Sequence, residues 1–93
     1  MFVLQVDIRV RAGRAGALEA VFSGAFSAAI RAQEGFRDVR LLRPLEGGNY
    51  VLSIAFEQQA LQQKWVATEL HARVWSQMEE HMDGYSLKPY TAV

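Results

Sequence analysis

The residues best suited to chemistry lie in one stretch near the C-terminal end, QQKWVATELHARVWSQMEEHMDG, which spans residues 62–84. This stretch holds both tryptophans and both histidines of the chain. Trp65 and His71 lie close together in the sequence, on a segment that we expect to be helical. A tryptophan can stack on an aromatic ligand and donate its indole N–H. The pair predicts either a site for an aromatic ligand or a bulky helix that packs on a sheet.

His71 is the candidate general base of such a site. Its ordinary pKa is about 6.5, so the neutral imidazole can accept a proton near neutral pH. The alternative is a histidine at the helix surface, or one with a purely structural role. His81 follows Glu79 and Glu80 near the expected helix end, where a cation suits the helix dipole, and we interpret it as a surface residue.

Trp65 is the second candidate catalytic residue, and its alternative role is a core anchor between helix and sheet. A pocket between the helices and the sheet would need aromatic walls and few polar groups. Candidate ligand-binding residues are Phe22, Phe26, Tyr50, Trp75 and Arg40. Arg40 would stabilise an oxyanion through a charge-assisted bond, or else form a surface or intersubunit ion pair. Trp75 is alternatively a dimer contact, and Tyr85 is a further group that could orient a phenol.

Composition excludes several classes of partner and site. Ten basic and ten acidic residues leave a net charge of zero, which argues against a nucleic-acid partner. The absence of cysteine rules out disulfides, thiolate metal sites and a cysteine nucleophile. No group of histidines and carboxylates has a convincing metal spacing, so no metal and no cofactor is expected. The first ten residues are too short and interrupted for a signal peptide or membrane span. We therefore expect a soluble, cytoplasmic protein.

Hydrophobic periodicity predicts six elements. Apolar residues alternate with polar ones from residue 2 to 11, which is typical of a strand with one apolar face. Helical spacing predicts a helix over 17–33, which ends at Gly35 because glycine accepts the left-handed conformation. The second helix has a possible break at Thr68, whose hydroxyl can cap a new segment. The expected strands span 2–11, 36–43, 50–57 and 85–90, and the expected helices span 17–33 and 58–82.

This order predicts a single domain, residues 1–93, of the α+β class. Two right-handed crossovers give a ferredoxin-like βαββαβ sandwich, with both helices on one face of a four-stranded antiparallel sheet. The opposite face carries small and mixed side chains. Hydrophobic residues make up 51% of this short chain, which favours an interface, so we expect a homodimer that pairs through this sheet face. The alternative is a monomer with a solvated sheet face.

Several of these residues occur in a pattern that resembles the antibiotic biosynthesis monooxygenase (ABM) family, and the resemblance covers nearly the whole chain. The segments that carry it are EGFRDVRLLR, YVLSIAFE and WVATELH. They supply the glycine-aromatic pair, the strand arginine, the acidic end of the next strand, and the helix tryptophan and histidine. In this chain those residues are Gly35, Phe36, Arg40, Glu57, Trp65 and His71. The resemblance implies a dimeric α/β barrel.

The resemblance also implies an activity, although the family is functionally mixed. Some members are cofactor-free oxygenases of phenols, anthrones or quinols, so we expect a monooxygenase of a small phenolic or quinol-type aromatic. The alternative is a non-catalytic homodimer that binds a small apolar molecule. Haem binding or degradation is a weaker match, because the asparagine and histidine positions of that branch are occupied by Val6 and Trp75.

Overall fold

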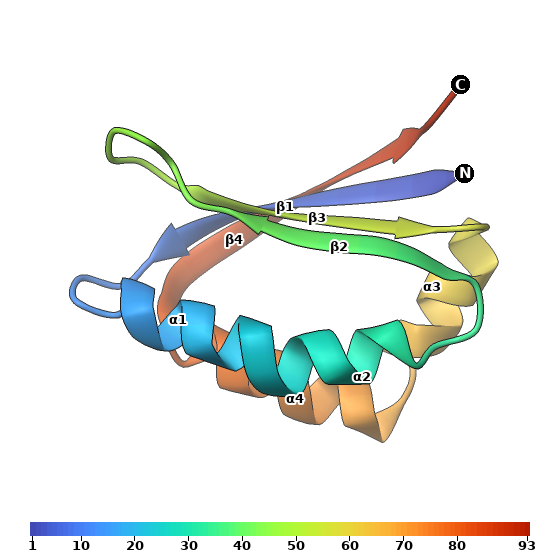
Figure 1. The fold of residues 1–93 in the computed structure, drawn as a ribbon, viewed down its shortest axis with the longest axis horizontal. Helices are drawn as coiled ribbons and strands as arrows, with labels where there is room; N and C mark the ends of the chain where they lie inside the picture. Colours follow the sequence, from blue (N-terminus) through green and yellow to red (C-terminus); the bar gives the residue numbers. More distant parts are fainter.

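A four-stranded antiparallel sheet covered on one face by helices makes up the structure, a computed structural model that describes residues 1–93 (Figure 1). The strands are β1 (Phe2–Val10), β2 (Phe36–Leu42), β3 (Tyr50–Phe56) and β4 (Met82–Thr91). Their order in the sheet is β2-β3-β1-β4, and each neighbouring pair is antiparallel. With helices between β1 and β2 and between β3 and β4, this is the predicted α+β, ferredoxin-like fold. Both termini lie at the same end of the molecule (Figure 1).

Alternation along the strands decides which side chains face the helices. Val6 of β1 pairs with Leu52 of β3 and with Leu87 of β4, so these three share one face of the sheet. That face also carries Ile8 and Phe56, both fully buried under the helices. The sequence-based assignment of the bulky face to the helix side is therefore confirmed.

The first helical stretch contains a turn that periodicity did not reveal. It runs as α1 (Ala15–Val21), a π-helical turn η1 (Phe22–Phe26) and α2 (Ser27–Arg31). The backbone N–H of Ser27 bonds to the carbonyl of Phe22, five residues earlier. The expected uninterrupted helix over 17–33 therefore differs from the structure by this inserted turn.

The second helical stretch is two helices, α3 (Gln59–Val66) and α4 (Glu69–Glu79). Thr68 adopts an extended backbone conformation between them and caps α4, as predicted. In α4, Val74 and Met78 are buried, whereas Leu70 is 36% exposed. None of the helices has the length and apolar content that a membrane crossing requires.

The last strand is longer than predicted. The expected strand spanned residues 85–90, with Asp83 and Gly84 ending the preceding helix, whereas β4 begins at Met82. Pairing with β1 extends past Gly84, through a register shift at Arg9 and Val10. Because β4 is an edge strand, it tolerates Pro89 as expected.

Candidate functional site

An apolar cavity lies between the sheet and the helices on the side of β1 and β4. Its volume is about 180 Å³, and nine of its eleven lining residues are hydrophobic. The π-helical turn contributes Phe26, α3 contributes Trp65, and α4 contributes His71 and Trp75. The edge strand β4 contributes Tyr85, so five of the residues that we singled out from the sequence meet at one cavity.

The junction between α3 and α4 holds the two candidate catalytic residues in place. The Thr68 hydroxyl donates to the carbonyl of Trp65, at 2.7 Å, and accepts from the backbone N–H of His71, at 3.0 Å. A single side chain thus ties the end of α3 to the start of α4. The bend that it caps lets both side chains turn toward the cavity.

His71 contacts the rings of two tryptophans. Its imidazole meets the Trp65 ring edge-on, with centroids 5.0 Å apart, and lies nearly parallel to the Trp75 ring, with centroids 6.3 Å apart. Tyr85 of β4 completes the row, packing edge-on against Trp75 at 5.1 Å. These rings surround the imidazole with apolar surface on several sides.

This surrounding has an electrostatic consequence. Burial lowers the pKa of His71 below its ordinary value of 6.5, because the apolar surface disfavours the charged imidazolium. The neutral imidazole, which is the form that accepts a proton, is therefore favoured over a wider pH range. That is the protonation state that a general base requires.

The two phenylalanines of the π-helical turn occupy successive layers. Phe26 is almost fully buried, lines the cavity and packs against Trp65 and Trp75, with ring centroids 6.3 and 6.1 Å away. Phe22 stacks on Phe26 at 6.2 Å but does not reach the cavity wall. Phe22 therefore lies behind the wall, and Phe26 is the one of the two phenylalanines that lines the cavity.

Two of the expected ligand-binding residues lie elsewhere. Arg40 pairs in register with Ser53 on the sheet face away from the helices, and its guanidinium bonds to Asp38 at 2.9 Å. This is the surface ion pair that we named as its alternative role.

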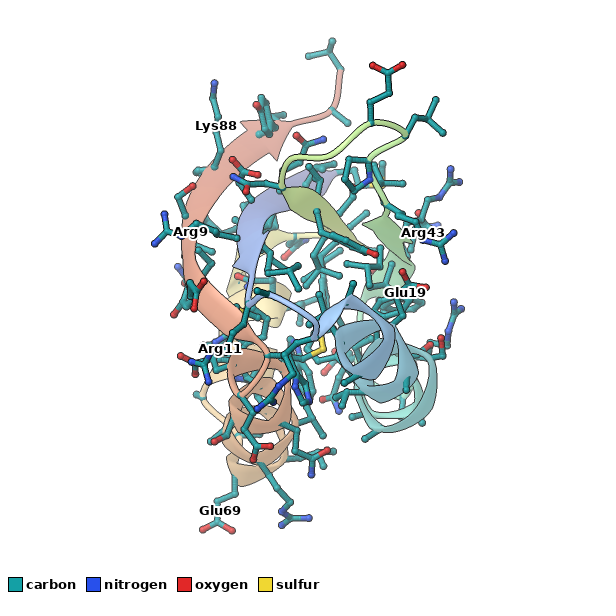
Figure 2. The ribbon with its side chains drawn as sticks, turned by 90° about the vertical axis from the view of Figure 1, so that its left-hand side faces the viewer. Arg9, Arg11, Glu19, Arg43, Glu69 and Lys88 are labelled. Carbon is teal, nitrogen blue, oxygen red and sulfur yellow. The ribbon has the colours of Figure 1, made fainter.

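Tyr50 is buried at the other end of the helix layer. Its hydroxyl donates to the carboxylate of Glu19 on α1, which also accepts two bonds from the guanidinium of Arg43. Figure 2 shows Glu19 and Arg43 together on the side of the molecule opposite Arg9 and Lys88. Hydrogen bonds from Arg43 and Tyr50 lower the pKa of Glu19 to about 2. This cluster fastens α1 to the end of β2 and is separate from the cavity.

Sequence reasoning missed one polar residue of the cavity, Gln62. It lies three residues before Trp65, so the two share a face of α3, and only 8% of its surface is exposed. The helical spacing was a usable signal. Gln62 belongs to the pair Gln62-Gln63, and it was not predicted to line a cavity because glutamine is ordinarily a surface residue.

Comparison with known protein families gives one match that covers most of the chain. The family model for antibiotic biosynthesis monooxygenases matches residues 1–77. The chain belongs to the antibiotic biosynthesis monooxygenase family. Members of this family are generally dimeric. A comparison with curated protein sequences found no match.

Solved structures share the same fold over nearly their full length. SnoaB from Streptomyces nogalater, a cofactor-independent oxygenase, is 20% identical with a TM-score of 0.82, over 99% of this chain and 93% of that chain. A mutant of MhuD with two manganese protoporphyrin IX bound per active site is 26% identical, with a TM-score of 0.84, over 100% and 95%. Rv0793 from Mycobacterium tuberculosis is 16% identical, with a TM-score of 0.82, over 99% and 94%. The fold of this chain is thus shared by a cofactor-independent oxygenase and by a protein whose structure holds a metalloporphyrin.

Proposed function

We propose that this protein is a cofactor-independent monooxygenase that acts on a small phenolic or quinol-type aromatic. The observation that supports the proposal is the position of the His71 imidazole, which contacts two tryptophan rings at the wall of an apolar cavity. An electron-rich aromatic becomes reactive toward dioxygen once it is deprotonated. The site combines a surface that binds such a ring with a group that can take its proton.

The cavity size fits a small substrate. A cavity of about 150 Å³ lined by apolar side chains holds a benzene ring, and this one measures about 180 Å³. Trp65 and Trp75 offer aromatic faces and edges against which the substrate ring can pack. We assign them the binding of the ring.

Proton transfer to His71 creates the reactive anion. The imidazolium and the substrate anion form together, and in an apolar cavity their attraction is stronger than in water. For a phenol whose keto tautomer carries a methylene carbon between aromatic rings, the anion adds dioxygen at that carbon, and loss of water from the hydroperoxide leaves a carbonyl. The balance is CH₂ + O₂ → C=O + H₂O, so the substrate supplies all four electrons.

Haem is the second candidate ligand, because the structure of the MhuD mutant holds a metalloporphyrin and shares this fold. Two features of this chain disfavour it. The cavity lining contains no cationic side chain to pair with the two propionates of a haem. The asparagine and histidine positions of the haem-degrading branch are occupied by Val6 and Trp75. Titration with haem tests this directly, and the expected result is no Soret band shift.

The decisive experiment measures dioxygen consumption by the purified protein with hydroquinones, anthrones and catechols. Uptake above autoxidation is expected for the wild type, and its loss is expected in His71→Ala. His81→Ala is the matched control, because this histidine bonds to Arg14 at 3.1 Å and does not line the cavity. Uptake that persists in His71→Ala rejects His71 as the base. Binding of these aromatics without any uptake supports the alternative, a non-catalytic binding protein.

A further inference from the structure

A second hollow continues the cavity along the edge strand. It measures about 400 Å³ and lies between α3 and β4, where Leu87 is 58% exposed and Val66 is 44% exposed. Leu4, Gln62, Val66 and Leu87 line both spaces, so the two are neighbours with a common wall. Together they form one site with an inner part beside His71 and an outer part beside β4.

Gln62 lies at the boundary between the two parts. It is the one polar residue among the buried residues of the chain, at 8% exposure. Its carboxamide forms no hydrogen bond within the chain, yet its polar atoms are not sealed from the hollows. Buried polar groups are ordinarily hydrogen-bonded, because leaving one without a partner costs free energy. The Gln62 carboxamide, which has no hydrogen-bond partner in the chain and faces the hollows, is therefore available to form a hydrogen bond with a polar group of a ligand.

Neither part of the site contains a charged side chain. The inner lining has Gln62 and His71 as its hydrophilic residues, and the outer lining adds Gln59 and Gln63. Other hollows of the protein differ, since one carries Glu19 and Arg43 and another carries Asp7 and Arg9. Arg9, Glu69 and Lys88 point outward, away from the layer between sheet and helices (Figure 2). A carboxylate or phosphate on a ligand would lose its hydration here without gaining a counter-charge.

We propose that the joined hollows bind one uncharged, elongated aromatic molecule, with a ring in the inner part and a hydroxyl or carbonyl group on the Gln62 carboxamide. The amide offers both a donor and an acceptor, so it matches either group. Gln62 is thus a specificity-determining residue that sets how far the ring reaches toward His71. The proposal rests on the proposed oxygenase function only where it treats this molecule as the substrate.

Binding of matched probes at neutral pH, followed by calorimetry, tests the ligand class. 4-Hydroxybiphenyl is elongated and neutral, phenol is its short counterpart, and biphenyl-4-carboxylate is its anionic counterpart. We expect 4-hydroxybiphenyl to bind at least about tenfold more tightly than either, because phenol buries one ring fewer and biphenyl-4-carboxylate brings an uncompensated charge. Equal or tighter binding of the carboxylate, or no binding of 4-hydroxybiphenyl, overturns the proposal.

A substitution separates the role of Gln62 from general apolar binding. Gln62→Leu is expected to weaken 4-hydroxybiphenyl by about tenfold and to leave biphenyl, which has no polar group, at wild-type affinity or better. Gln58→Leu is the control, because Gln58 caps α3 through its backbone and lines neither hollow. If Gln62→Leu fails to fold, Gln62→Met keeps the side-chain length and replaces it. Unchanged binding of 4-hydroxybiphenyl in the folded variant overturns the assignment.

Dioxygen uptake distinguishes this proposal from the proposed function. Selective binding of the neutral probe without uptake by any substrate leaves the ligand site standing and rejects the oxygenase. Uptake whose KM does not change in Gln62→Leu leaves the oxygenase standing and rejects the role of Gln62.

Discussion

His71 owes its proposed role to its surroundings more than to its residue type. The chain has two histidines, and burial lowers the pKa of His71. His81 bonds to the guanidinium of Arg14, whereas His71 packs against Trp65 and Trp75. The sequence placed both histidines on the same helical segment. The packing of the rings around His71 distinguishes them.

The lowered pKa of His71 predicts the pH dependence of activity. The base works only when neutral, so kcat/KM should fall as the pH drops through the pKa of His71. Because burial lowers that pKa, the midpoint should lie below the ordinary value of 6.5. Between the lowered pKa of folded His71 and the ordinary pKa of the unfolded chain, the unfolded chain binds more protons than the folded one. The free energy of unfolding should therefore also decrease as the pH drops through this range. Oxygen-uptake rates across pH 4–8 check the activity, with denaturation midpoints measured alongside. An acid midpoint above 6.5 contradicts the buried base.

Trp65 is a core residue as well as a wall of the cavity, since only 2% of its surface is exposed. Trp65→Ala is expected to lower the free energy of unfolding by about 3–5 kcal/mol, because it removes a large buried side chain and leaves a void. Equilibrium denaturation measures this change. Trp75→Ala is the comparison, and its loss should be smaller because Trp75 is only partly buried. A loss below about 1 kcal/mol for Trp65→Ala shows that Trp65 is not a core anchor.

The helix junction at Thr68 is the element on which the site geometry depends. Its hydroxyl bridges the carbonyl of Trp65 and the N–H of His71. Thr68→Ala should cost about 1 kcal/mol of stability through the lost cap. The substitution should also lower kcat while changing KM less, because His71 lies in the first turn of α4, which the cap holds in place. Thr68→Ser keeps the hydroxyl and should retain both properties. Equal kinetics for the two variants would show that the cap does not position His71.

Secondary structure was largely predictable, and the exceptions have physical causes. Alternation identified the apolar faces of β1 and β3, and the hydroxyl of Thr68 marked the break between α3 and α4. The π-helical turn at Phe22–Phe26 escaped detection because one inserted residue barely disturbs a broad apolar stripe. The start of β4 was missed because Asp83 and Gly84 resemble a helix end. In the structure, pairing of β4 with β1 overrides that local preference.

The site was only partly predictable, because it is assembled from elements distant in the chain. Trp65, His71 and Trp75 were found through their spacing on one helical stretch, and they do meet at the cavity. Tyr50 and Arg40 could not be placed in the same way. Their positions depend on which end and which face of the sheet the cavity occupies, and that is set by tertiary packing. Gln62 was missed because its burial follows from the same packing.

The two faces of the sheet have different proposed roles, one in ligand binding and the other in dimer formation. The cavity lies on the helix side, whereas the open side carries Val3, Val51, Ser53 and Ala55 at its centre. We propose that two copies of the chain pair through this open side, which is consistent with the dimers common in the family. A stable interface buries about 800 Å² per chain, which a four-stranded sheet face can supply.

Ser53 tests this arrangement because it lies opposite both Gln5 and Arg40 in the middle of the sheet. Wild-type protein should sediment as twice the 10.5 kDa chain mass. Ser53→Arg should sediment as a single chain, because a bulky cation beside Arg40 obstructs face-to-face packing. Ala72→Arg on the exposed side of α4 is the control and should remain dimeric. A wild-type monomer, or a dimeric Ser53→Arg protein, rejects this interface. Since the cavity lies on the other face, the dissociated variant should still bind 4-hydroxybiphenyl, and loss of that binding would mean that the partner chain completes the site.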